Sequence, residues 1–255
     1  MTVKHLNTLR MISLGLLCVA AIAAVLMMRS PQWLPLLGCI LLLLVWMRVL
    51  LARMMRLVKN LGYDKLDPER LAAELHELAR VLKWPPARGN RNLIHRLMAL
   101  LYELRGQYPQ AVDEIMQIDH GKAGIRDGTR WDAARLYLRE GKPEMAWALI
   151  QQVMAANPSY AGPSGPHQLH VMGLLHLERG ELRQAEERLR AALALRERGF
   201  GGLNSLYDLA RVQERLNQAG KAGELFLRAA ALGPGTHLGQ EAAKMADAQG
   251  TPIGE

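Results

Sequence analysis

A chain of 255 residues accommodates one modest domain with an appendage, and an aromatic content of 5% without alternating apolar and polar runs predicts an all-α fold. The two cysteines, Cys18 and Cys39, both lie in apolar segments, which argues against a secreted module built on disulfide bonds. The formal net charge of +8 is concentrated in residues 1–65, which carry eight basic side chains and one acidic side chain, so the nearly neutral remainder does not favour binding to nucleic acid.

Residues 11–59 predict a transmembrane hairpin of two helices. Met11–Met28 is free of charge, and a helix of that length spans about 27 Å, which is close to the hydrocarbon thickness of a bilayer. Trp33–Ala52 is again apolar except for Arg48, whose long side chain can reach the headgroups. A pair of buried soluble helices is the alternative, although such helices seldom lack a polar face over this length.

The basic residues around the hairpin predict its orientation. Lys4 and Arg10 precede the first span, three basic residues follow the second, and only Arg29 lies in the turn. The positive-inside rule then places both ends in the cytoplasm, with residues 1–10 as a cytoplasmic amino terminus. In an alternative, the first span is a signal cleaved at Ala21-Ile22-Ala23, and the second span returns the chain to the same side. We therefore expect an integral protein of a bacterial inner membrane.

Residues 60–91 are expected to form a linker and a capping helix. A polar connection begins at Asn60, and Asp67 and Pro68 then suit the N-cap and the first position of a helix. Leucines recur at helical spacing from Leu71 onward, so this helix needs a partner for its apolar stripe. We expect it to pack on the helices that follow; a free spacer is the alternative.

Residues 92–236 repeat one pattern four times, in segments 92–125, 127–160, 166–199 and 203–236. Position 8 holds Ala99, Ala134, Gly173 and Ala210, position 20 holds Ala111, Ala146, Ala185 and Ala222, and position 24 holds Ile115, Ile150, Leu189 and Phe226. Small residues at positions 8 and 20 let two antiparallel helices approach closely, and glycine at position 15 of three copies suits the turn between them. One such hairpin cannot bury its apolar face alone, so we expect the copies to stack into a solenoid.

This pattern resembles the tetratricopeptide repeat, a helical hairpin of 34 residues. The tryptophan that the family carries at position 4 is absent here, and the tyrosine at position 11 remains only as Tyr102 and Tyr137. The resemblance implies an α-solenoid in which the first helix of each hairpin lines a concave surface, with residues 237–255 as a capping helix and tail. The order of two spans followed by repeats is also similar to the layout of HemY-type proteins.

No residue pattern indicates catalysis. His167, His170 and His176 come closest to a metal cluster, but no cysteine accompanies them and their spacing matches no zinc motif. Gly121-Lys122 and Gly141-Lys142 lack the other residues of a phosphate-binding loop. We therefore expect no enzyme activity, no metal and no cofactor.

The candidate binding site is the groove that the resemblance implies. Carried onto this chain, its lining positions are Arg96, Trp131, Arg135, Arg139, His167, His170, Asn204, Tyr207, Arg211 and Arg215. Arginine binds carboxylates through two hydrogen bonds and aromatic rings offer rigid contact area, so this lining predicts an acidic peptide or acidic disordered tail as ligand. The alternative is that the arginines pair with Asp132, Asp208 and Glu214 and only solvate the surface.

Together these features predict a membrane-tethered, non-catalytic scaffold that binds a partner protein or peptide on the cytoplasmic face and supports assembly of a membrane complex. Tethering raises the effective concentration of the partner. One alternative is a structural subunit that acts through its hairpin, where Gly15 and Gly38 allow close helix packing. Another is an enzyme whose site has no recognisable motif. The oligomeric state is not predicted.

Overall fold

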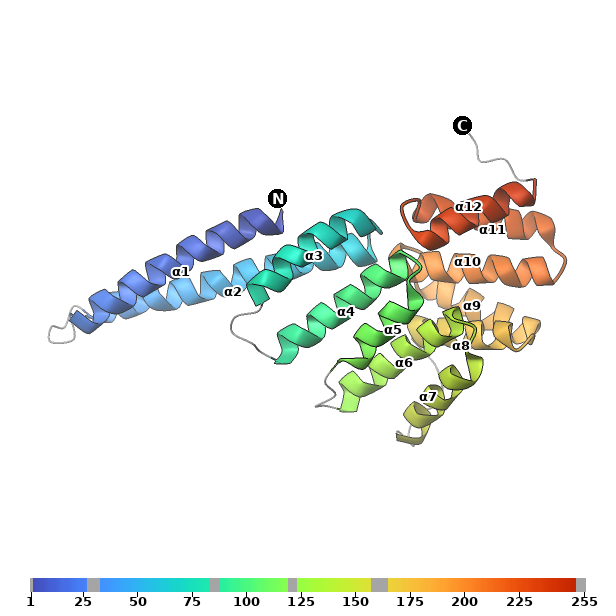
Figure 1. The fold of residues 1–255 in the computed structure, drawn as a ribbon, viewed down its shortest axis with the longest axis horizontal. Helices are drawn as coiled ribbons and strands as arrows, with labels where there is room; N and C mark the ends of the chain where they lie inside the picture. Colours follow the sequence, from blue (N-terminus) through green and yellow to red (C-terminus); the bar gives the residue numbers. More distant parts are fainter. Residues whose placement is uncertain (1, 27–32, 83–87, 119–122, 157–164, 251–255) are drawn as a thin grey trace.

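The computed structural model describes residues 2–26, 33–82, 88–118, 123–156 and 165–250 (Figure 1). Over these residues the chain forms twelve helices and no strand, which confirms the all-α prediction. In chain order the helices are α1 (Val3–Leu26), α2 (Trp33–Tyr63), α3 (Pro68–Leu82), α4 (Arg88–Leu104), α5 (Tyr108–Met116), α6 (Ala123–Arg139), α7 (Pro143–Ala156), α8 (Pro166–Glu178), α9 (Leu182–Leu195), α10 (Gly199–Arg215), α11 (Ala219–Leu232) and α12 (His237–Ala248).

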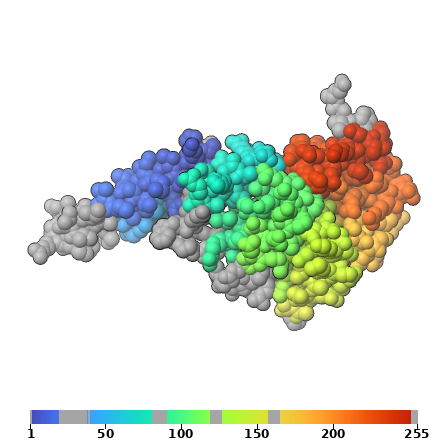
Figure 2. All heavy atoms as spheres, in the orientation of Figure 1, coloured from blue at the N-terminus to red at the C-terminus, as the bar shows by residue number. Residues whose placement is uncertain are grey.

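Helices α1 and α2 pack along each other as a hairpin, and Figure 2 shows that this hairpin extends away from the rest of the molecule. The turn expected at residues 29–32 and the last two residues of the first predicted span lie outside the described residues. Large apolar side chains are exposed on both helices, among them Val19 at 66% and Leu42 at 71%. Within the described ranges, no helix combines the length and hydropathy needed to cross a membrane. The transmembrane character of the hairpin stays a prediction.

Helix α2 continues without a break to Tyr63, so the connection expected to begin at Asn60 begins only after Tyr63. The reason is packing. Leu61 is 1% exposed, and a Cβ placed on Gly62 would lie 2.6 Å from the side chain of Leu100. These residues extend the apolar face of α2 into the core, and the helix therefore runs past the end predicted for the hairpin.

The C-terminal half of α2 belongs to the core of the body. Leu50, Met54, Val58 and Leu61 are at most 1% exposed and pack in one cluster with the leucines of α3 and α4. Burial of each such side chain stabilises the fold by about 1.5–3 kcal/mol. The hairpin is therefore joined to the body through shared core residues, and α2 itself makes the connection.

In the described part of the chain, helices α4 to α11 form four consecutive pairs, α4–α5, α6–α7, α8–α9 and α10–α11 (Figure 1). The small residues at repeat positions 8 and 20 are all buried where the two helices of a pair meet. Gly173 shows why they must be small, since a Cβ there would lie 2.7 Å from Leu189 Cγ.

The turn inside each pair uses a left-handed residue at position 15. The φ angles of Gly106, Gly141 and Gly180 are +74°, +72° and +77°. The fourth pair carries Asn217 at this position, with φ of +59°. Asparagine tolerates this conformation better than other residues with a side chain, so the fourth turn keeps the geometry without glycine.

The stack closes on itself. One apolar cluster unites α1–α4 with α10–α12, and α12, expected only as a C-terminal cap, also reaches α4. At the closure, Tyr63 meets Phe200 edge to face with ring centroids 6.1 Å apart. Gly199, with φ of +63°, lies so close to the carbonyl oxygen of Tyr63 that no Cβ fits there. The two predicted caps therefore complete one core, while residues 251–255 of the tail lie outside the described residues.

Substituting Gly199 with alanine should lower the free energy of unfolding by about 2–4 kcal/mol, because the added Cβ combines a left-handed backbone with overlap on the Tyr63 carbonyl. The matched control is Gly141→Ala, where φ is +72° but nothing lies within 4 Å of the added Cβ. That change should cost only about 1–2 kcal/mol. Denaturant unfolding of the full chain in detergent measures both. Equal losses would contradict a stabilising contact at the closure.

Candidate functional site

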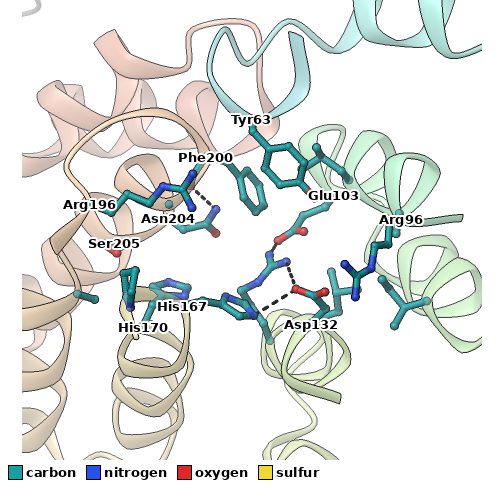
Figure 3. Close-up of a pocket in the computed structure, with 18 residues that line it drawn as sticks. Tyr63, Arg96, Glu103, Asp132, His167, His170, Arg196, Phe200, Asn204 and Ser205 are labelled. Atoms are coloured by element: carbon teal, nitrogen blue, oxygen red, sulfur yellow. Dashed lines mark hydrogen bonds and ion pairs between the residues drawn. The ribbon is translucent and has the colours of Figure 1, made fainter. Parts of the chain in front are cut away.

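A pocket lies where the first helices of the four pairs face one another (Figure 3). Helices α4, α6, α8 and α10 supply most of its lining, Tyr63 comes from the end of α2, and Arg196 follows α9. The cavity volume is about 140 Å³. A single water needs roughly 10–15 Å³ on this measure, so the pocket has room for a side chain or a small group of atoms.

The structure distributes the ten predicted groove residues over several environments. Those that line this pocket are Arg96, Arg135, His167, His170 and Asn204. Those that line a second cavity, of about 320 Å³, are Arg139, Tyr207 and Arg211. Trp131 is 2% exposed and packs in the core, and Arg215 donates a hydrogen bond of 2.7 Å to the carbonyl oxygen of Leu177. The residues of the predicted groove therefore do not form one continuous groove. They line two cavities or lie buried in the core.

A buried ion-pair network forms the wall between the two cavities. The guanidinium of Arg139 donates to both carboxylate oxygens of Asp208, at 2.6 and 2.7 Å, and to Asn204 Oδ1 at 2.8 Å. His170 Nε2 lies 2.8 Å from Asp208 Oδ2, and Asp208 is 0% exposed. Arg211 adds a longer contact of 3.7 Å to the same carboxylate and pairs with Glu178 at 2.9 Å. Arg139 and Arg211 are therefore both paired with carboxylates of neighbouring residues.

The network fixes the charge states of its members. Burial opposes ionisation of Asp208, but Arg139 and His170 outweigh burial and hold the pKa of this carboxyl well below its usual range. Burial also lowers the pKa of His170 to about 4, although its hydrogen bond to Asp208 works in the opposite direction. At neutral pH the imidazole is therefore uncharged and the Arg139–Asp208 pair is fully ionised, which suits a structural role.

Arg135 is one of the residues that line the first pocket. Its side chain is 7% exposed, forms an ion pair with Glu103 and lies 3.8 Å from Asp132. Its guanidinium is 4.9 Å from the centroid of the Phe200 ring, within the range of a cation–π contact. Burial, with a smaller contribution from Arg139, lowers the pKa of Arg135 to about 9, so it stays charged at neutral pH.

Two further arginines lie on opposite sides of the pocket (Figure 3). Arg96 comes from α4 and Arg196 from the segment after α9, and neither forms an ion pair within the described residues. Gly201 leaves space for Arg196, since a Cβ there would lie 2.9 Å from Arg196 Cδ. The two carboxylates of the lining are both engaged, Glu103 with Arg135, and Asp132 with Arg135 and, at 3.2 Å, with His167. The pocket thus offers unpaired cations but no unpaired carboxylate.

Glu103, Phe200, Tyr63 and Arg196 are among the lining residues that the sequence did not predict, and each has a definable reason. Glu103 lies on the first helix of the first copy, but an acidic residue does not suit a lining that is predicted to bind carboxylates. Phe200 lies on α10 because this helix begins at Gly199 and not at Leu203, where the fourth copy was placed. Tyr63 and Arg196 lie outside the first helices of the repeats, and only the folded chain brings them to the pocket.

The histidines considered as a metal cluster bind separate partners. His167 lies near Asp132, His170 near Asp208, and His176 Nδ1 is 2.5 Å from Glu181 Oε2. In the part of the chain that the structure describes, no three histidine, cysteine, aspartate or glutamate side chains are arranged to hold a metal ion.

Comparison with known proteins adds no assignment. No protein-family model matches the chain, and no curated protein matches it in sequence. The resemblance to tetratricopeptide repeats and the layout shared with HemY-type proteins therefore stay predictions.

The pH dependence of stability should report the buried histidine. The unfolded chain takes up a proton on His170 near pH 6.5, and the folded chain does so only near pH 4. The free energy of unfolding should therefore fall by about 3 kcal/mol as the pH falls from about 7.5 to about 4. This contribution is present above the unfolded pKa and disappears below it. In urea titrations at several pH values, His170→Gln should flatten the slope in this window. A slope in His170→Gln that is as steep as in the native chain would contradict the assignment.

Proposed function

We propose that the protein is a non-catalytic adaptor that binds a short acidic segment of a partner protein in the first pocket and is tethered to a membrane by the α1–α2 hairpin. The observation that carries this proposal is the pair Arg96 and Arg196. They lie on opposite sides of one pocket, and neither has a counter-charge within the described residues. Because the lining carboxylates are already engaged, the groups left to bind a ligand are hydrogen-bond donors with positive charge.

The shape of the pocket favours a short segment over a long extended peptide. The closure between Tyr63 and Phe200 forms one side of the pocket, and the Arg139–Asp208 network separates it from the second cavity. A single acidic side chain or chain end fits a volume of about 140 Å³. The buried pair of Arg135 and Glu103 then gives the pocket a fixed floor that needs no reorganisation on binding.

The repeat region supports the adaptor role. The four helical pairs, their buried small residues and their left-handed turn residues agree with a solenoid of tetratricopeptide-like repeats over residues 92–236. Solenoids of this kind bury their apolar faces by stacking and leave the first helices free to present a binding surface. The carboxylates of the site serve as ion-pair partners, and neither a nucleophile with its base nor a metal is part of the proposal.

The exposed apolar side chains of the α1–α2 hairpin support its proposed role as a membrane tether. Its exposed large apolar side chains are Leu9, Met11, Ile12, Leu14, Leu16 and Val19 on α1, and Leu41, Leu42, Leu44, Val45, Trp46 and Val49 on α2. An exposed apolar surface of this extent marks a membrane or protein contact. With the positive-inside rule, we propose insertion in a bacterial inner membrane, with the repeats on the cytoplasmic side.

Replacing Arg96 and Arg196 with neutral residues tests whether the first pocket binds an acidic ligand. The double variant Arg96→Gln and Arg196→Gln should bind a fluorescein-labelled decapeptide of glutamates about tenfold or more weakly than the native chain, because charge-assisted hydrogen bonds are lost at both sides. Fluorescence anisotropy of the full chain in detergent, at low ionic strength, measures the affinity. The control is Arg183→Gln together with Arg228→Gln, which removes two exposed charges outside the pocket. An equal loss in both double variants would reject the pocket as the binding site.

A structural subunit that acts through its hairpin is the second candidate, favoured by the same exposed apolar side chains. Removing the hairpin up to residue 59 would not separate the two functions, since Leu50, Met54 and Val58 belong to the core of the body. Point substitutions in the hairpin do separate the two functions. Leu42→Ser with Val45→Ser leaves the pocket intact, so in intact membranes an adaptor should still crosslink to the partners of the native chain. Loss of every crosslinked partner in this variant would favour the structural subunit.

A further inference from the structure

The outer surface of α2 carries a row of basic side chains, Arg48, Arg53, Arg56 and Lys59, which we call the basic face. All four are exposed. At 100° per residue they fall within an arc of about 140° on the helix, opposite the buried residues of α2. The same helix therefore packs one side into the core and presents the other side as a strip of positive charge.

The basic face has no counter-charge within the described residues. Residues 1–63 contain no aspartate or glutamate, so α1 cannot supply one. Helix α3 packs on both α1 and α2, but its three glutamates are engaged elsewhere. Glu69 pairs with Arg105, Glu74 accepts a hydrogen bond from the backbone N–H of Val3, and Glu77 pairs with Arg80. Four positive charges are thus held close together with only solvent to screen them.

An apolar band continues the same side of the helix. Leu41, Leu42, Val45 and Val49 are exposed by 54, 71, 61 and 39% and lie on the same arc as the basic face. From Leu42 to Arg53 the distance along the helix axis is about 16 Å at 1.5 Å per residue. A single side of α2 therefore changes from apolar to basic within about 16 Å, which is enough to extend from the hydrocarbon of a bilayer past one headgroup layer of about 5–8 Å.

We propose that the basic face binds the acidic headgroups of membrane lipids while the apolar band lies in the hydrocarbon. This inference rests on the membrane tether of the proposed function and adds a lipid class to it. Arg48 and Arg53 would lie among the headgroups, Arg56 would remain within a Debye length of about 8 Å, and Lys59, about 9 Å from Arg53 along the axis, would lie at the limit of that length. Because Tyr63 follows Lys59 by one helical turn, the pocket wall then stands close to the membrane surface.

The test uses the full chain reconstituted in phosphatidylcholine vesicles. Quenching of tryptophan fluorescence is compared for brominated phosphatidylglycerol and brominated phosphatidylcholine. The native chain should associate with the acidic lipid about tenfold more strongly than with the neutral lipid, and 1 M salt should abolish the preference. In the triple variant Arg53→Gln, Arg56→Gln and Lys59→Gln the ratio should fall to about one. The control removes the same number of charges from the body, through Arg183→Gln, Lys221→Gln and Arg228→Gln, and should keep the preference.

The outcomes separate this inference from the proposed function. A native chain that both lipids quench equally keeps the tether and overturns the acidic-lipid site. A native chain quenched by neither lipid overturns the tether itself. A preference that survives in the triple variant overturns the assignment to these residues. Because all three substituted side chains are exposed, the variant should unfold at the temperature of the native chain, which circular dichroism checks.

Discussion

The close approach of α2 to α10 is the contact on which the rest of the structure depends. At Gly199 the two backbones come so near that only a residue without a side chain is allowed, and Tyr63 and Phe200 pack beside it. This contact turns a linear stack of helical pairs into a closed body with one shared apolar cluster. It also creates the pocket, because two of its lining residues are the two aromatic rings of the closure.

Much of the local architecture follows from a pattern of 34 residues that occurs four times. Small residues at two fixed positions, a larger apolar residue at a third and a left-handed turn position predict paired helices, and Asn217 shows that the turn depends on backbone tolerance and not on glycine alone. The closure could not be predicted in this way. It joins Tyr63 to Phe200 and His237 to Gly106, which are distant in the sequence and have no repeated pattern in common.

The candidate site was predictable only in part, because side-chain position on a helix does not reveal ionic partners. Arg139 occupies a groove position, yet Asp208 engages it through two hydrogen bonds and makes it part of the wall. Trp131 also occupies such a position, but the helices turn it into the core. Arg96 is also an arginine on the first helix of a pair, but it forms no ion pair with the described residues. The distinction between a structural and an available arginine rests on the acidic residues that the fold places next to each.

Helix α2 is continuous for 31 residues, and that length is about 46 Å at 1.5 Å per residue. It begins in the hairpin, passes through the core and ends with a side chain in the pocket wall. A continuous helix of this kind contains no hinge. One unbroken helix therefore joins the exposed apolar side chains of the hairpin to the contact between Tyr63 and Phe200, with no linker between them.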